Sequence, residues 1–409
     1  MRELIVAGVG PGSEDRITPA VSEVIRAADC VVAASRHLSL AKGHSRIITL
    51  GDFKTAFAQM EAQEGRVVVL VSGDPGLYSL LPLLKRHFPN VPVRVLPGIS
   101  ALQCLCAAVA ETWQDAAVLS GHGRPLSGTK FLNTVEHSRL TVLFCGKEHS
   151  PRWACEKLAK AAGDLGKRVE VVVGERLSYP DQCITRGAPA ELAGGNYAPL
   201  SLVLIRNPEP WTPPRHLRDD DLERGSVPMT HEEVRAVILG RLSLTPGAVL
   251  WDVGAGTGSV AAAAALDCPD AEVHAIECAP EALDLIERNR AKFRLHNLTV
   301  HAGRALSLTD KLPLPTHVFI GGSGGELRGI LSHLAGMERS VHVLVSAVTL
   351  GTLGEATSLL SSVPWDNFEA LQIAVSASRP LGRSLLMAAR NPVTLLCAES
   401  HPNSEEAGE

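Results

Sequence analysis

The stretch Trp251-Asp252-Val253-Gly254-Ala255-Gly256-Thr257-Gly258 ends an apolar run and precedes an alanine-rich one, Ser259 to Leu266. This order predicts a strand, a glycine turn and a helix. Glycine is needed where the backbone takes a positive φ angle or where a ligand must touch the main chain, and the first turn of a helix presents free N–H groups. The stretch therefore predicts a polar ligand bound at the turn.

The spacing of the glycines indicates which ligand suits this turn. A dinucleotide fingerprint has its third glycine at the sixth position, but that position, counted from Gly254, is Ser259. The acid-x-Gly-x-Gly-x-Gly order instead resembles motif I of the class I S-adenosylmethionine methyltransferases, in which the acid, here Asp252, faces the amino-acid end of the cofactor. Glu277 follows the next expected strand, where a carboxylate can accept ribose hydroxyls. An NAD-linked oxidoreductase and a turn without ligand remain alternatives.

Residues 207–228 read NPEPWTPPRHLRDDDLERGSVP, with five prolines and a cluster of acids. Neither helix nor strand periodicity can persist through such a segment. We therefore expect a domain over 1–207, a linker over 208–227, a second domain over 228–399 and a disordered tail over 400–409.

Strands and helices alternate in both halves, which predicts α/β folds with largely parallel sheets covered by helices and ligands at the carboxyl ends of strands. In the first half the expected strands are 4–7, 30–33, 67–71, 93–96, 116–119, 141–144, 169–173 and 200–205, with a helix over 19–28. In the second half strands are expected at 249–253, 272–276, 298–301, 317–320 and 341–346, and helices at 230–242, 259–266 and 280–293.

Composition narrows the classes of function. The net charge of −5 and the aromatic content of 4% argue against nucleic acid as the main partner. The nine cysteines include no CxxC pair, which predicts reduced core thiols and no metal site. The chain has no run of about 18 apolar residues and no leader-like start, so we expect a cytoplasmic protein without a membrane span.

Four segments of the second half, MTHEEVRAVILGRL, PGAVLWDVGAGTGSVAAAAAL, AIECAPEALDLIERN and FIGGSGG, resemble the decarboxylating C15-methyltransferase domain of cobalamin biosynthesis over about 228–392. The resemblance implies a Rossmann-like class I fold with cofactor contacts at Asp252, Gly254, Gly256, Gly258 and Glu277, and substrate contacts at Gly322, Ser323 and Gly324. The sequence departs from that family at His231 (usually lysine), Arg304 (usually an acid), Ser346 (usually asparagine) and Gly351 (usually glutamate).

Three glycine and proline loops follow strands in the first half, at residues 6–12, 71–76 and 96–102, and could form one cleft. Together they resemble the tetrapyrrole methylases (class III methyltransferases), whose cofactor lies between two α/β subdomains. The resemblance implies cofactor contacts at Gly8, Gly10, Pro11, Gly73, Asp74, Pro75, Gly98 and Ser100.

Residues 17–20, 35–38 and 120–124 of the first half look like the C5-methylating branch of the tetrapyrrole methylases. This implies substrate contacts at Arg36, His37, His122 and Arg124. Other roles remain open: Asp74 could start a turn, Arg36 and His37 could cap a helix, and His122 and Arg124 could be solvated loop residues.

The two resemblances imply S-adenosylmethionine-dependent methylation of a precorrin-6 intermediate at C5 and C15, with decarboxylation of the C12 acetate to give precorrin-8. They imply two cofactor sites, one per domain, and a homo-oligomer. Arg379, Arg383 and Arg390 are further candidates for holding substrate carboxylates. No residue identifies itself as the proton donor. Methylation of RNA or a translation factor, or a fusion with one non-catalytic half, are alternatives.

Overall fold

The computed structural model describes residues 2–123, 125–161 and 163–400, so Arg124 and residues 401–409 lie outside the described residues. The chain forms two compact units. The first contains the strands and helices up to Leu126, together with Ser138–Lys160 and Leu165–Pro210. The second contains Ser127–His137, Ala161–Asp164 and the chain from Trp211 onward. Within the described residues, no helix combines the length and apolarity that crossing a bilayer requires.

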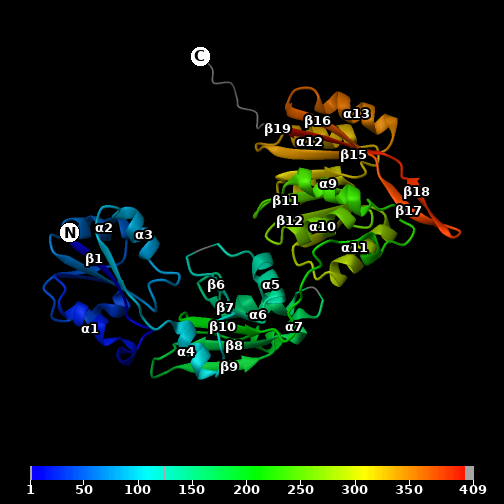
Figure 1. The fold of residues 1–409 in the computed structure, drawn as a ribbon. Coiled ribbons are helices and arrows are strands. Elements are labelled where there is room, and N and C mark those ends of the chain that lie inside the picture. The colour runs from blue at the N-terminus through cyan, green and yellow to red at the C-terminus, as the bar shows by residue number, and fades with distance from the viewer. Residues whose placement is uncertain (1, 124, 162, 401–409) are drawn as a thin grey trace, which may run out of the picture. The chain divides into compact units, whose positions relative to one another are not determined.

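The first sheet of the first unit is fully parallel, as expected, with strand order β3-β2-β4-β1-β5. Helices cover both of its faces: residues of α2 and α3 join one core cluster, and residues of α1 join the other (Figure 1). Its elements are β1 (Glu3–Gly8), α1 (Pro19–Arg26), β2 (Cys30–Ala33), β3 (Ile47–Thr49), α2 (Phe53–Glu61), β4 (Arg66–Val71), α3 (Leu81–His87) and β5 (Val93–Leu96).

The second sheet of the first unit has the order β6-β7-β10-β8-β9 and corrects the expectation of a largely parallel sheet. Only β6 and β7 pair in parallel, and the other three pairs are antiparallel. The cause is a short return: β8 and β9 are joined by seven residues, too few for the crossover that parallel strands need. The elements are α4 (Ala101–Ala108), β6 (Ala117–Ser120), β7 (Leu140–Phe144), α6 (Pro151–Ala159), α7 (Leu165–Arg168), β8 (Glu170–Glu175), β9 (Cys183–Gly187), α8 (Pro189–Leu192) and β10 (Ser201–Arg206).

The second unit is built on a seven-stranded sheet with the order β13-β12-β11-β14-β15-β19-β16. Its first five strands are parallel, and β19 and β16 add two antiparallel pairs that the sequence did not predict. Helices α9 to α11 pack on one face, and α12 and α13 pack on the other. The elements are β11 (Val249–Val253), β12 (Glu272–Glu277), β13 (Leu298–Ala302), β14 (His317–Ile320), β15 (Val341–Ala347), β16 (Trp365–Ile373), β19 (Val393–Ser400), α9 (Glu232–Leu242), α10 (Ser259–Asp267), α11 (Pro280–Lys292), α12 (Leu327–Ala335) and α13 (Leu350–Leu360).

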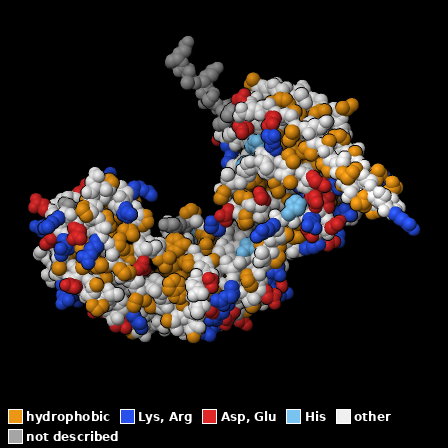
Figure 2. All heavy atoms as spheres, in the orientation of Figure 1, with side chains coloured by type: hydrophobic (Ala, Val, Ile, Leu, Met, Phe, Trp, Pro, Cys, Tyr) orange, Lys and Arg blue, Asp and Glu red, His pale blue; other side chains and the backbone are white. Residues whose placement is uncertain are grey.

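Two further elements belong to the second unit. The hairpin of β17 (Ser376–Leu381) and β18 (Ser384–Ala389) extends from the sheet and exposes apolar side chains such as Leu385, with basic side chains at its tip (Figures 1 and 2).

Helix α5 (Gly128–His137) follows β6 in the sequence, but its contacts group it with the second unit. The buried Glu136 on α5 pairs there with Arg294 and His296.

The proline-rich segment is packed rather than free. It holds one short 3-10 turn, Asp219–Asp221, and buries Leu217 and Leu222 in the core of the second unit. The expectation that a disordered tail starts at residue 400 is wrong for Ser400. It is the last residue of β19, is 1% exposed, and its hydroxyl accepts a hydrogen bond from the Val341 N–H.

Candidate functional site

The three loops of the first unit meet at the carboxyl ends of β1, β4 and β5. The Gly73 N–H donates to the Gly10 carbonyl at 2.8 Å, which bridges the first two loops. A side chain on Gly8 or Gly98 would lie within 2.8 Å of the other glycine's backbone and of the Gly73 carbonyl. The sequence pattern thus corresponds to one assembled cleft, in which glycine permits three backbones to touch.

Asp74 and Ser100 hold these loops together. The carboxylate of Asp74 accepts from the Gly76 N–H at 2.7 Å and from the Gly98 N–H at 3.1 Å. Ser100 caps α4, because its hydroxyl accepts from the Gln103 N–H while its own N–H donates to the Gln103 side chain. Asp74 therefore does start a turn, and both side chains fix the walls of the cleft.

Arg36 and His37 lie in a 3-10 helix, Ser35–Ala41, and converge on Ser72. His37 Nε2 lies 2.7 Å from the Ser72 hydroxyl, and Arg36 donates to the same hydroxyl and to His37. Burial, and secondarily the nearby Arg36 guanidinium, lowers the pKa of His37 to about 4. His37 is therefore a neutral acceptor that positions Arg36 at the cleft.

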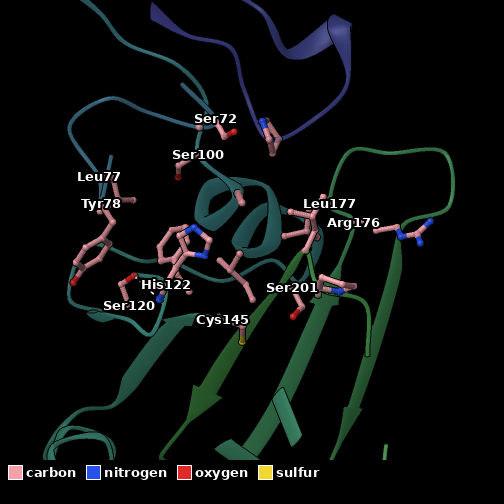
Figure 3. Close-up of a pocket in the computed structure, with 18 of the residues that line it drawn as sticks. Ser72, Leu77, Tyr78, Ser100, Ser120, His122, Cys145, Arg176, Leu177 and Ser201 are labelled. Carbon is pink, nitrogen blue, oxygen red and sulfur yellow. Dashed lines mark hydrogen bonds between the residues drawn. The ribbon is translucent and has the colours of Figure 1, made fainter. Parts of the chain in front are cut away.

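A cavity of about 200 Å³ lies against these loops (Figure 3). Of the predicted residues, Pro11, Arg36, Gly73, Asp74, Ser100 and His122 line it, whereas Gly8, Gly10, His37, Pro75 and Gly98 do not. The sequence reasoning missed Ser72, Tyr78, Arg176 and Tyr179, which also line the cavity. Ser72 could have been found, since it directly precedes Gly73, but the loop after β8 carried no glycine signal.

The glycine turn of the second unit forms as the sequence predicts. Gly254, Gly256 and Gly258 all have positive φ angles, and Gly258 directly precedes α10. A side chain on Gly254 would lie 2.2 Å from the Gly322 carbonyl, so this turn and the loop after β14 touch backbone to backbone.

Asp252 and Glu277 stand on either side of this turn. Asp252 is 1% exposed; its Oδ2 accepts from the Ala261 N–H at 2.9 Å, and its Oδ1 has no hydrogen-bond partner within the part of the chain that the structure describes. Burial, reinforced by the charge of Glu277, raises the pKa of Asp252 to about 7, against the lowering effect of the Ala261 N–H. Glu277 accepts from the N–H groups of Gly256, Cys278 and Ala279.

A cavity of about 560 Å³ is lined by Asp252, Gly254, Gly256 and Glu277, and by residues from several other parts of the unit. Among these parts are the segment before α9, the loop after β14, the end of β15 and the segment before β19, which contribute His231, Gly321, Ser346 and Asn391. Arg390, one of the suggested carboxylate-binding arginines, also lines it and pairs with Glu233 at 2.7 Å. Arg379 and Arg383 lie on the hairpin and do not line this cavity.

A second, smaller cavity of about 250 Å³ adjoins Gly254 and Glu277 from the side of β13. It is lined by the predicted residues Gly322, Ser323 and Gly324, and also by Arg304. Arg304 donates to Glu326 at 2.7 Å and to the Gly324 carbonyl at 2.8 Å. Arg304, which replaces the acid usual in the family, therefore fixes the position of the glycine loop after β14.

The residues fit an S-adenosyl cofactor at the turn of the second unit. The partnerless Asp252 Oδ1 is a buried acceptor beside the larger cavity, suited to an ammonium group. Glu277 fits a ribose less fully than the sequence suggested. Its carboxylate already accepts three backbone N–H groups, two at Oε1 and one at Oε2. Oε2 can therefore accept about one further hydrogen bond, from a single hydroxyl.

Known families match the two halves of the chain separately. Residues 3–193 match the family model of the tetrapyrrole (corrin/porphyrin) methylases, and residues 223–400 match that of the precorrin methyltransferase domain. The precorrin-6Y C(5,15)-methyltransferase [decarboxylating] of Sinorhizobium sp is 29% identical over 85% of this chain and 84% of its own. Two proteins of Salmonella typhimurium each match one half. The cobalt-precorrin-6B C(15)-methyltransferase (decarboxylating) is 34% identical over 46% of this chain and 97% of its own. The cobalt-precorrin-7 C(5)-methyltransferase is 32% identical over 49% of this chain and 98% of its own.

The chain therefore belongs to the tetrapyrrole methylases over its first half and to the precorrin methyltransferase family over its second. The resemblance that the sequence indicated for each half is confirmed. Tetrapyrrole methylases use S-adenosylmethionine as the methyl donor.

Proposed function

We propose that this chain methylates a precorrin-6 intermediate at C5 and C15 and removes the C12 acetate carboxyl as carbon dioxide, giving precorrin-8 in cobalamin biosynthesis. The observation that carries the proposal is the presence of two separate cavities, one at each predicted cofactor loop, in a chain whose halves match a C(5)- and a C(15)-methylating relative. We assign C5 methylation to the domain over 1–207 and C15 methylation with decarboxylation to the domain over 228–399.

In the second unit, we assign the amino-acid end of S-adenosylmethionine to Asp252 and one ribose hydroxyl to Glu277. The unpaired Asp252 oxygen and the remaining acceptor position on Glu277 support this assignment. Gly254 and Gly256 leave the backbone open to the ligand, and Gly258 allows α10 to begin at the turn. The smaller cavity beside Arg304 supports a place for the adenine.

In the first unit, we assign the second cofactor site to the cleft of the three loops. The polar atoms of Asp74 and Ser100 are engaged within the protein, so these residues act by holding the loops, and the backbone of the loops would meet the cofactor. Gly8, Gly10, Pro11, Gly73, Pro75 and Gly98 shape that backbone.

The bound sulfonium supplies an electrophilic methyl group, so no metal or strong base is needed for its transfer. The task of the chain is to align an electron-rich ring carbon with that methyl group and to exclude water. Both cavities are partly apolar, with Leu177 and Leu202 in the first and Val260 and Phe319 in the second. Such walls suit the hydrocarbon part of a tetrapyrrole ring.

Peripheral carboxylates of the substrate require cations at the mouths of the cavities. Arg36, His122 and Arg176 line the first cavity, and Arg390 lines the second. Arg124, which the sequence also indicated, lies outside the described residues. We propose that these groups fix which ring carbon faces the methyl donor. Gly322, Ser323 and Gly324 line the smaller cavity, which we assign to the adenine, and they do not line the larger one, so their predicted substrate contacts are not part of this assignment.

The proposal places the protein in the cytoplasm as a homo-oligomer that acts on a small molecule. The expectation that the cysteines are core thiols holds for six of them, whereas Cys104 is half-buried and Cys183 and Cys278 are exposed.

The test is the mass of the product formed by the purified full-length chain from precorrin-6B and S-adenosylmethionine. We expect a gain of two methyl groups and the loss of one carbon dioxide. A gain of one methyl group would mean that one half is silent, and an unchanged substrate would overturn the proposal.

A further inference from the structure

We propose that His231, held by Asp219, donates the proton that completes the decarboxylation in the second unit. This inference rests on the proposed function, because it concerns the step in which the C12 acetate becomes a methyl group. His231 stands directly before α9 and lines the larger cavity, together with the turn at Gly254 and Gly256.

The orientation of His231 is fixed by a network behind it. Its Nδ1 lies 2.6 Å from Asp219 Oδ2, and the Asp219 N–H donates to the Glu232 side chain at 3.0 Å. Arg235, only 2% exposed, donates to Asp219 Oδ1 at 2.7 Å and to the carbonyls of Thr230 and Leu217. With Nδ1 committed to Asp219, Nε2 is the ring nitrogen left for the cavity.

Asp219 is suited to stabilise a protonated imidazole. Burial alone would raise the pKa of Asp219, but the hydrogen bonds from His231 and Arg235 and their charges outweigh it and lower the pKa below its usual value. The carboxylate therefore stays ionised. A carboxylate bonded to Nδ1 holds the imidazole ring in place and directs its other ring nitrogen outward, as in other acid–base pairs of this kind.

The other titratable groups of the cavity are engaged elsewhere. Glu277 already accepts three backbone N–H groups, and Arg390 pairs with Glu233 and does not release protons near neutral pH. Asp252 is buried beneath the glycine turn, where its free oxygen is assigned to the cofactor. His231 is 44% exposed in its side chain, so it can exchange protons with solvent after each turnover.

The step balances with this donor. The bond between the acetate methylene and its carboxylate breaks, carbon dioxide leaves, and the electron pair passes into the conjugated ring. The methylene then takes the Nε2 proton of the imidazolium, which becomes neutral imidazole and is protonated again by solvent. C12 and C15 lie on the same edge of the macrocycle, joined through C13 and C14, so one cavity can hold both reacting positions.

The experiment compares wild type, His231→Gln, His231→Lys and the control His333→Gln, all as full-length chains. His333 lies on α12 and does not line the cavity. The readouts are the initial rate of carbon dioxide loss between pH 5.5 and 9 and the affinity for S-adenosylhomocysteine by titration calorimetry. The charged groups around His231 that could affect its pH profile are Asp219, Glu232, Arg235, Asp252, Glu277 and the Glu233–Arg390 pair.

We expect His231→Gln to lower decarboxylation by about a hundredfold or more, with cofactor affinity within about threefold of wild type. His231→Lys should restore part of the rate and move the alkaline fall of the rate to higher pH, because an ammonium is a weaker acid than an imidazolium. The control should match wild type. A glutamine variant that decarboxylates normally or loses cofactor binding, or a lysine variant no better than glutamine, would overturn the assignment. Absence of decarboxylation in wild type would overturn the proposed function itself.

Discussion

The Asp74 carboxylate accepts a hydrogen bond from the Gly98 N–H at 3.1 Å, and so joins the loop after β4 to the loop after β5. Replacement by alanine would leave this N–H and that of Gly76 without their acceptor, at a cost of about 1–3 kcal/mol. We expect Asp74→Ala to reduce C5 methylation by at least about tenfold and to leave C15 methylation unchanged, as measured by the mass of the products.

The control for this variant is Asp52→Ala. Asp52 caps α2 by accepting from the Thr55 N–H, so its loss should lower the free energy of unfolding without changing either methylation. Equal losses of C5 methylation in the two variants would show that Asp74 matters only for stability.

The turn of the second unit gives an independent prediction. At Gly254 an added methyl group would lie 2.2 Å from the Gly322 carbonyl, and φ is +68°, so Gly254→Ala strains the backbone in two ways. We expect a loss of at least about 2 kcal/mol in the unfolding free energy of this unit and loss of C15 methylation, with C5 methylation retained. Gly240→Ala is the control, because this glycine lies within α9 and has open space around it. It should stabilise the protein by up to about 1 kcal/mol.

Cofactor binding to the second unit should depend on pH through Asp252. Its pKa is raised to about 7, chiefly by burial, so the carboxyl is mostly neutral below that pH. An ammonium group binds the anion better, and the affinity should therefore rise on the order of tenfold between pH 5.5 and 7.5. Calorimetric titration of the Asp74→Ala variant isolates this site. Asp252→Asn should bind the cofactor weakly at every pH. If the cofactor affinity of this variant rose with pH as steeply as that of wild type, Asp252 would be excluded as the cause of the pH dependence.

Acid should destabilise the second unit through His274. Burial, and secondarily His301, lowers the pKa of His274 to about 4, and the two rings are hydrogen-bonded at 3.0 Å. The folded-state pKa is lower than the unfolded one, so this contribution is present above about pH 6.5 and is lost as pH falls toward 4. We expect a loss on the order of 1–3 kcal/mol over this range and a shallower fall in His274→Gln, measured by urea unfolding. If the unfolding free energies of wild type and His274→Gln fell equally with pH, His274 would not be the cause of the loss.

The sequence predicts most of the parallel strands and also β8 and β10, which pair antiparallel, but it misses the short parallel β3 and the antiparallel β9 and β16 to β19. Strands such as β1, β4 and β11 are buried apolar runs followed by glycine loops, which is a local signal. Strand β9 reads Cys183-Ile184-Thr185-Arg186-Gly187 and has no fully buried residue, so nothing in its residues marks it as the partner of β8. Strands β16 to β18 are mostly exposed, and their pairing depends on contacts distant in sequence.

The residues of the candidate sites also divide into those that the sequence reveals and those that only the fold brings together. Glycines and the acids that follow strands are visible in the sequence because each is required by its own local backbone. Asp219, in contrast, belongs to a run of three acids within a proline-rich segment, and only the fold brings it to His231 and Arg235. Tyr78 and Arg176 reach the first cavity in the same way, from loops without a recognisable pattern.

The central claim is that one chain holds two unrelated sites for the same methyl donor. Titration of the full-length protein with S-adenosylhomocysteine measures this directly. We predict two molecules bound per chain in wild type, one in Asp74→Ala and one in Gly254→Ala, with different enthalpies for the two single sites. A stoichiometry of one in wild type, or its loss in both variants, would contradict the claim.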